Sequence, residues 1–114
     1  MIEELNIAFK LLQLLTRMRK RLRVSGPSML PEFQPGDEIL FNPKAYRHKL
    51  PKVGDIVVAR HPYQTKLIIK RVALVLEDGS CFLTGDNPEA STDSRSYGFI
   101  PLNQIIGKVT HKFP

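Results

Sequence analysis

The sequence is poor in several features that would point to particular protein classes. Of its 114 residues, only one is cysteine and none is tryptophan. A single cysteine excludes an internal disulfide and any metal site built from several cysteines. A membrane-spanning helix needs roughly 20 mostly apolar residues, and Asn6, Lys10 and Gln13 interrupt the longest candidate, at residues 5–15. The length fits one small domain, and the apolar fraction of 42% argues against a disordered chain.

Residues 1–23 combine helical spacing with a concentration of positive charge. Apolar residues recur at steps of three and four between residues 8 and 22. Residues 1–24 contain six basic and two acidic residues and so carry four of the six net positive charges. We expect an amphipathic helix that packs on the domain or a partner, or that lies on an anionic membrane surface. Because the charges follow the apolar stretch, the reverse of a secretory signal, we expect a cytoplasmic protein with at most peripheral membrane contact through residues 1–23.

From residue 24 to residue 114 the pattern changes to short apolar runs separated by turns. The nine prolines favour turns and short strands over a helical bundle. Asp78-Gly79 is typical of a hairpin turn between two such runs. The predicted fold class is therefore mainly β, an antiparallel domain preceded by one N-terminal helix. The expected strands span residues 38–41, 55–59, 66–76, 81–84 and 105–109.

A serine that could act as a nucleophile lies in a stiff loop. Ser28 stands between Pro27 and Pro31 and close to Gly26. The prolines restrict the backbone, and the glycine allows a peptide to approach closely. These features suit a nucleophile, but they also suit an ordinary turn.

A serine nucleophile needs a neighbouring base, and the best candidate is a lysine. His48, His61 and His111 lack the pattern of a catalytic triad, and we expect all three on the surface. Lys70 follows the apolar residues 67–69, where burial against a dry wall would lower the pKa of its ammonium group. The alternative is a lysine whose stem is buried while its charged end stays in water.

A long polar segment, residues 85–99, supplies a third element. It is dense in hydrogen-bonding side chains and contains Asp and Arg residues at short spacing. Such a segment can brace a site, and taken alone it can equally be a surface loop.

Taken together, the three elements resemble the sequence boxes of the signal peptidase I family. Gly-Pro-Ser-Met-Leu-Pro followed by Pro-Gly-Asp resembles the serine box, and Ile-Lys-Arg-Val, about 40 residues later, resembles the lysine box. Gly-Asp-Asn, Ser-Thr-Asp-Ser-Arg and Gly-Phe-Ile-Pro resemble the C-terminal box. Order and spacing agree over residues 24–109. The resemblance implies a Ser/Lys endopeptidase on a largely β fold.

The resemblance also implies roles for individual residues. Ser28 would attack the scissile carbonyl, and neutral Lys70 would take its proton and later protonate the leaving amine. No metal or cofactor would be needed for cleavage. The supporting residues would be Ser91, which orients the lysine, and two ion pairs, Asp86 with Arg71 and Asp93 with Arg95.

The sequence departs from the family pattern at one position near the expected substrate contacts. Gly26 stands where some relatives carry a serine that helps to form the oxyanion hole, so the hole is expected to use backbone N–H groups, including that of Ser28. Gly26 and Met29 are expected to contact the substrate, which would bind in extended form along a strand edge.

The substrate is implied by a narrower resemblance. The amino-acid sequences of the boxes, with Val-Val-Ala-Arg-His-Pro between them, are similar to those in the proteases that mature nickel-type superoxide dismutase. The substrate would then be the N-terminal extension of the apo-dismutase, and nickel would belong to that substrate. The alternatives are a membrane-associated signal peptidase I or an inner-membrane-type peptidase. From another class, a non-catalytic β-barrel could bind nucleic acid through its basic arm, although no reading motif supports this and we expect no nucleic-acid partner.

Overall fold

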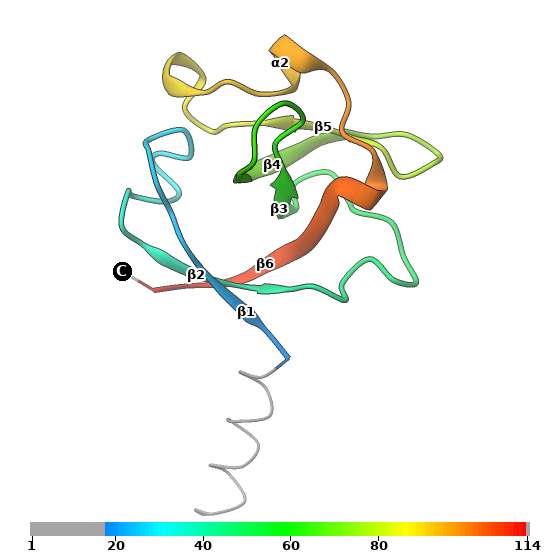
Figure 1. Ribbon diagram of the computed structural model, residues 1–114, viewed down its shortest axis with the longest axis horizontal. Coiled ribbons are helices and arrows are strands. Elements are labelled where there is room, and N and C mark those ends of the chain that lie inside the picture. The colour runs from blue at the N-terminus through cyan, green and yellow to red at the C-terminus, as the bar shows by residue number, and fades with distance from the viewer. Residues whose placement is uncertain (1–17, 114) are drawn as a thin grey trace, which may run out of the picture.

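Antiparallel strands make up most of the structure, a computed structural model that describes residues 18–113 (Figure 1). Within this range, six strands form one sheet in the order β1-β2-β6-β3-β4-β5. The predicted mainly β antiparallel fold is confirmed. The strands are β1 Lys20–Arg23, β2 Glu38–Asn42, β3 Ile56–Arg60, β4 Leu67–Val75, β5 Cys81–Thr84 and β6 Ile105–Phe113. Between β5 and β6 lie the short helical segments η1 Pro88–Ala90, α2 Ser94–Tyr97 and η2 Leu102–Gln104.

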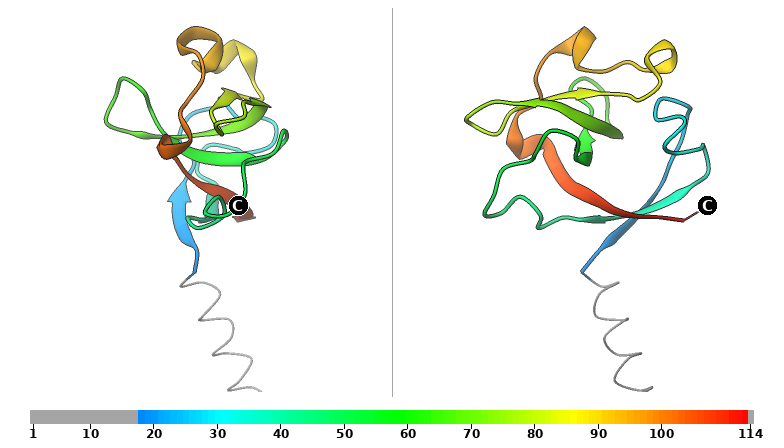
Figure 2. Two further views of the ribbon diagram at one scale, coloured as in Figure 1. Left: turned by 90° about the vertical axis from the view of Figure 1, so that its right-hand side faces the viewer. Right: turned by 180° about the vertical axis from the view of Figure 1, so that it is seen from behind.

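The long strand β6 joins the two halves of the sheet and bends between them (Figures 1 and 2). Its first residues pair with β3 and its later residues with β2. Gly107 lies at the bend, where a Cβ atom would come within 2.6 Å of the carbonyl oxygen of Asn42. A glycine is therefore required where β6 passes this close to β2.

The core consists of two apolar clusters on opposite faces of β3 and β4. Val57 and Ala59 belong to one cluster and Val58 to the other, and all three side chains are fully buried. This burial explains why β3 is apolar at successive positions instead of alternating. The first cluster contains Val57, Ala59, Ile68, Val72, Cys81, Leu83, Ile100 and Ile105. The second contains Val24, Met29, Phe33, Ile39, Phe41 and Val58.

The five strands predicted from the sequence are all present. Four of them match within one residue at each end, and β6 continues to Phe113 instead of ending at residue 109. The predicted Asp78-Gly79 turn is also confirmed. Gly79 N–H donates to the carbonyl of Leu76, and the backbone of Gly79 has a positive φ of 85°.

The prediction of a helix over residues 1–23 is wrong for residues 18–23, of which Met18 lies in a turn and Arg19 in a bend. Lys20–Arg23 form β1 and pair with β2. Arg21 and Arg23 form ion pairs with Glu38 on that strand, and Leu22 packs against the second apolar cluster. The cross-strand contacts thus override the helical spacing. The rest of the predicted helix, residues 1–17, lies outside the described residues. No helix within residues 18–113 has the length and apolarity to cross a membrane.

Candidate active site

A groove of about 410 Å³ beside the first half of β4 contains both Ser28 and Lys70. Residues 22–29 form one wall and residues 66–70 the other. The remaining lining residues are His61, Ala90 and Thr92. Within the described residues, β4 pairs with β3 over residues 67–71 but with β5 only from Arg71 onward. The backbone of residues 67–70 therefore presents an unpaired strand edge beside Lys70.

Ser28 lies in the turn that follows β1, and Asn87, in the segment after β5, holds the backbone of this turn. The backbone N–H of Asn87 donates to the carbonyl of Ser28 at 2.8 Å, and Asn87 Nδ2 donates to that of Pro27 at 3.1 Å. Gly26, two residues earlier, has a φ of 76°, a conformation that favours glycine. The N–H of Ser28 donates no hydrogen bond within residues 18–113. In the described part of the chain, this N–H group is therefore available as a hydrogen-bond donor.

Gly26 and Met29, the predicted substrate contacts, both line the groove. Gly26 is exposed, whereas the side chain of Met29 is only 1% exposed and packs in the second apolar cluster. Met29 therefore joins the wall of the groove to the core beneath it.

Lys70 lies in the middle of β4, on the face that carries the first apolar cluster. It is 5% exposed and pairs across the sheet with the fully buried Val57. Its Nζ atom donates to Ser91 Oγ at 3.0 Å. Burial lowers the pKa of Lys70, and the nearby charges of Lys66 and Arg95 lower it further, against the opposing effect of Asp93. Lys70 therefore loses its proton at a lower pH than an ordinary lysine.

Ser91 connects Lys70 to a buried carboxylate. Its hydroxyl donates to Asp93 Oδ2 at 3.0 Å. Because a serine hydroxyl has only one proton, Ser91 Oγ must act as an acceptor toward Lys70. When Lys70 is neutral, its lone pair is therefore directed elsewhere than at Ser91.

Asp93 is 1% exposed and gathers hydrogen bonds from three other residues. It accepts from Gly85 N–H at 2.8 Å, from Arg95 Nε at 2.9 Å and from the Ser91 hydroxyl. Burial alone would raise the pKa of Asp93, but the bonds from Arg95, Gly85 and Ser91 outweigh it and hold the pKa well below its usual range. Asp93 also caps α2 through the N–H of Arg95. A buried, ionised aspartate thus anchors the segment behind Lys70.

Arg71 and Asp86 form the second ion pair. Arg71 Nε and Nη2 donate to the two carboxylate oxygens of Asp86, each at 2.9 Å. Arg71 Nη1 also donates to the carbonyl of Gly54 at 3.1 Å. This two-pronged contact holds the segment after β5 against β4.

Ser28 and Lys70 share the groove, but within residues 18–113 no hydrogen bond joins them. Lys70 Nζ instead donates to Ser91. Long distances between catalytic groups are common in enzymes without substrate, and they shorten when a substrate fills the site.

Three further residues shape the site and were missed in the sequence. A Cβ atom on Gly85 would collide with the side chain of Ser91 and lie 2.7 Å from the carbonyl of Ser28. Asn87, which holds the Ser28 loop, belongs to the same Gly-Asp-Asn motif, which is the signal that could have identified both. His61 was expected on the surface, but it is half-buried and lines the groove.

Neither a metal nor a reactive thiol is evident at this site. Across residues 18–113, no three His, Cys, Asp or Glu side chains gather closely enough to hold a metal ion. Cys81 lies fully buried in the first apolar cluster, and burial raises the pKa of its thiol to about 11.

Comparison with known proteins gives a consistent set of relatives. The family described as signal peptidase, peptidase S26, matches residues 5–75 and 73–113. The chain is 36% identical over 109 residues to the human mitochondrial inner membrane protease subunit 1, covering 77% of this chain and 65% of that protein. It is 33% identical over 108 residues to an ATP-independent inner membrane protease subunit 1a of Arabidopsis thaliana, covering 75% and 64%. A probable signal peptidase I-1 of Synechocystis is 26% identical over 158 residues, covering 95% and 81%.

The matches to the mitochondrial proteins cover a little under two thirds of their length. The family match nevertheless includes all three of the sequence boxes and nearly the whole chain. By this match, the chain belongs to the signal peptidase family, peptidase S26.

Proposed function

We propose that this protein is a serine endopeptidase in which Ser28 is the nucleophile and Lys70 the general base. The observation that carries the proposal is the burial of Lys70, at 5% exposure, in the same groove as Ser28. A lysine can act as a base near neutral pH only if its pKa is lowered, and burial is the cause found here. Membership of a peptidase family supports the same chemistry.

Acylation begins when Ser28 Oγ attacks the scissile carbonyl carbon and its proton passes to the lone pair of Lys70. The negative charge on the carbonyl oxygen is stabilised by the free N–H of Ser28. The C–N bond then breaks, and the Lys70 ammonium returns the proton to the leaving amine. The acyl group remains bonded to Ser28 Oγ.

Deacylation repeats these steps with water. Lys70 takes a proton from a water molecule that attacks the acyl carbon, and it returns this proton to Ser28 Oγ as the ester bond breaks. Ser91 holds the amine in place throughout because its own proton is engaged with Asp93.

The substrate binds in extended form along residues 67–70. Their unpaired backbone edge can add a strand, as other sheet edges do when they capture peptides. Main-chain hydrogen bonds supply affinity in this mode, and the lining side chains supply selectivity.

The finer proposal is removal of an N-terminal extension from a precursor, with nickel-type superoxide dismutase as the first candidate. It rests on the amino-acid sequences of the three boxes. This substrate would be cleaved in the cytoplasm, with nickel bound only by the processed product.

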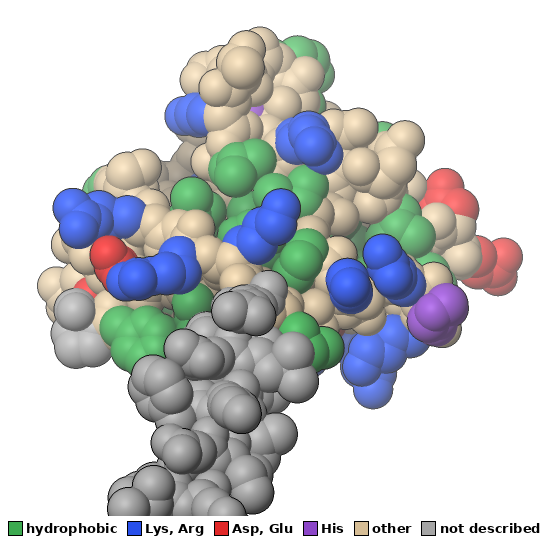
Figure 3. Space-filling model, turned by 60° about the horizontal axis from the view of Figure 1, so that its bottom comes forward, with side chains coloured by type: hydrophobic (Ala, Val, Ile, Leu, Met, Phe, Trp, Pro, Cys, Tyr) green, Lys and Arg blue, Asp and Glu red, His purple; other side chains and the backbone are tan. Residues whose placement is uncertain are grey.

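A membrane-associated signal peptidase is the second candidate. The relatives favour it, because they include inner membrane proteases and a signal peptidase I of Bacillus caldolyticus. Lys and Arg side chains also surround apolar ones on the face seen in Figure 3. Such a face suits contact with an anionic membrane surface.

Co-expression with defined precursors tests both candidates. One culture would carry a nickel superoxide dismutase precursor and another a secreted protein with its signal sequence. Intact mass of each precursor would show removal of the extension, and the Ser28→Ala variant would serve as the control. Processing of the dismutase alone supports the first candidate, and processing of the secreted protein alone supports the second. Failure to cleave either precursor, or any other protein added to purified enzyme, would argue against the peptidase itself.

A further inference from the structure

The groove is lined by positive and neutral side chains only. Its ionisable lining residues are Arg23, His61, Lys66 and Lys70, and no Asp or Glu lies among the lining residues. Arg23 is partly neutralised by Glu38 at 3.6 Å, and Lys70 is buried against Ser91. Lys66 is exposed, and within residues 18–113 it forms no ion pair. Among the exposed cations of the lining, Lys66 is therefore the one without an acidic partner in the described part of the chain.

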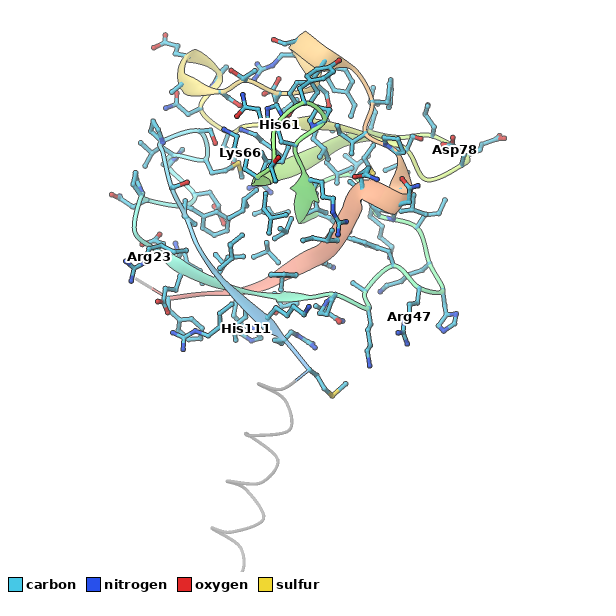
Figure 4. All side chains as sticks on the ribbon, in the orientation of Figure 1. Arg23, Arg47, His61, Lys66, Asp78 and His111 are labelled. Carbon is cyan, nitrogen blue, oxygen red and sulfur yellow. The ribbon has the colours of Figure 1, made fainter. Side chains whose placement is uncertain are left out.

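Lys66 and His61 face each other at the closed end of the β3–β4 hairpin (Figure 4). His61 N–H donates to the carbonyl of Lys66 at 2.9 Å, which continues the pairing of Arg60 with Leu67. Residues opposite each other in an antiparallel pair point to the same face. Alternation along β4 places Lys66 on the face that also carries Lys70.

His61 is fixed with one ring nitrogen facing the backbone. Its Nδ1 atom accepts the N–H groups of Tyr63 and Gln64, each at 3.0 Å. The ring also packs against Tyr97, with the ring centroids 5.6 Å apart. Because Nδ1 is an acceptor, the proton of the neutral ring is on Nε2. His61 therefore offers an N–H donor beside the ammonium of Lys66.

The spacing along β4 relates this pair to the scissile bond. Lys66 precedes Lys70 by four positions, which is about 13 Å in an extended strand. A substrate strand added to the edge of β4 advances at the same rate. A substrate side chain near Lys66 therefore lies about four residues from the bond that Ser28 attacks.

We propose that Lys66 and His61 form a subsite that selects an acidic side chain of the substrate, about four residues from the scissile bond. The proposal rests on the peptidase function proposed above. A carboxylate accepts from both an ammonium and an imidazole N–H, and no acidic lining residue competes for it. Lys66 is the specificity-determining residue, and His61 is the second donor.

Peptide binding tests the subsite without depending on cleavage. The probes are two labelled peptides of about ten residues, long enough to cover residues 66–70 on both sides, that differ only in an Asp or a Lys at the tested position. The Asp or Lys is placed at each peptide position in turn. Binding of each pair to the Ser28→Ala protein is measured by fluorescence anisotropy at low salt. We expect the Asp peptide to bind about threefold to fivefold tighter at one position, as an exposed ion pair allows. The preference should disappear in about 1 M NaCl.

Charge reversal identifies the residue responsible. Lys66→Glu should favour the Lys peptide, and Lys66→Gln should leave no preference. Lys49→Glu makes the same exchange in the exposed loop between β2 and β3. This variant should bind both peptides as the protein with Lys49 does. Figure 4 shows Arg47 of this loop far from His61 and Lys66. Equal binding of the two peptides at every position, absence of binding, or a preference for Asp that survives Lys66→Glu would overturn the proposal.

Cleavage of a proteome-derived peptide mixture separates this inference from the proposed function. Wild-type protein should enrich Asp and Glu about four residues from the cleaved bonds, and Ser28→Ala should cleave nothing. Cleavage without this enrichment overturns the subsite and leaves the peptidase intact. A binding preference without Ser28-dependent cleavage supports the subsite and argues against the proposed peptidase function.

Discussion

The backbone N–H of Asn87 donates to the carbonyl of Ser28 at 2.8 Å, joining the loop after β1 to the segment after β5. Gly85 makes this approach possible, because a Cβ atom there would lie 2.7 Å from the same carbonyl. The backbone of Ser28 is therefore positioned by a contact between two loops that are distant in the sequence.

Gly85→Ala should disturb this contact. The added methyl group collides with the Ser91 side chain and the Ser28 carbonyl, so we expect a loss of about 1–3 kcal/mol in the free energy of unfolding. Activity should fall at least tenfold, because both Ser28 and Ser91 must move. Denaturant titration and a cleavage assay measure the two effects. Unchanged stability and activity would show that the loops tolerate a side chain here.

Ser28→Ala should abolish cleavage and leave the fold intact. The hydroxyl is the only group removed, and the hydrogen bond from Asn87 goes to the backbone of Ser28. Circular dichroism and intact mass of a cleaved precursor provide the measurements. Ser25→Ala is the matched control, because Ser25 lines the same groove and should retain most activity. Wild-type rates from Ser28→Ala would rule out the proposed nucleophile.

Lys70→Arg and Lys70→Ala should both be inactive. Arginine keeps the charge but cannot lose a proton near neutral pH. In the wild type, the rate should rise with pH as Lys70 becomes neutral, and the midpoint should lie below the ordinary lysine value of about 10.4 because burial lowers this pKa. A rate independent of pH from about 6 to 9, with the chemical step limiting, would contradict lysine as the base. Lys49→Ala is the control, because Lys49 is an exposed lysine outside the groove.

The rising part of this pH profile should move in opposite directions in two variants. Asp93 favours the ammonium form of Lys70, so Asp93→Asn should lower the Lys70 pKa and move the rise to lower pH. Arg95 disfavours the ammonium form, so Arg95→Gln should raise the pKa and move the rise to higher pH. Both shifts are read from kcat against pH. Shifts in the same direction would mean that these charges do not act on Lys70.

The Arg71–Asp86 pair should show measurable coupling in a double-mutant cycle. Its two parallel hydrogen bonds of 2.9 Å are partly shielded from water, so we expect a coupling free energy of about 1 kcal/mol. The cycle uses Arg71→Ala, Asp86→Ala and the double variant, each unfolded in urea. It separates this contact from the bond that Arg71 makes to Gly54. Strictly additive effects would show that the pair contributes nothing to stability.

Much of the fold could be predicted because its signals are local. Short apolar runs ended by Gly, Pro and Asp identify β2 to β6, and β3 is recognisable as a buried strand from its apolar residues alone. β1 was missed because three of the four residues in Lys20–Arg23 are basic and the segment continues a helical spacing. Its strand form depends on Glu38 and Ile39 of β2, which no local pattern reveals.

The candidate site was predictable to a similar extent. The sequence boxes identified Ser28 and Lys70 and both partners of each ion pair. They could not identify His61, because its place in the groove depends on the register of the β3–β4 hairpin and on packing against Tyr97. The role of Asn87 was hidden for the same reason, since its partner is a backbone carbonyl distant in the sequence.

The one cysteine provides a chemical measure of how often the core opens. Cys81 is fully buried, and its thiol donates to the carbonyl of Gly79 at 3.3 Å. A thiol reagent can therefore react only when β5 separates from its neighbours, and the labelling rate reports the free energy of that opening. A peptide that binds only the closed form of the groove would slow the labelling. The wild-type protein can thus report on its own ligands without an attached fluorophore.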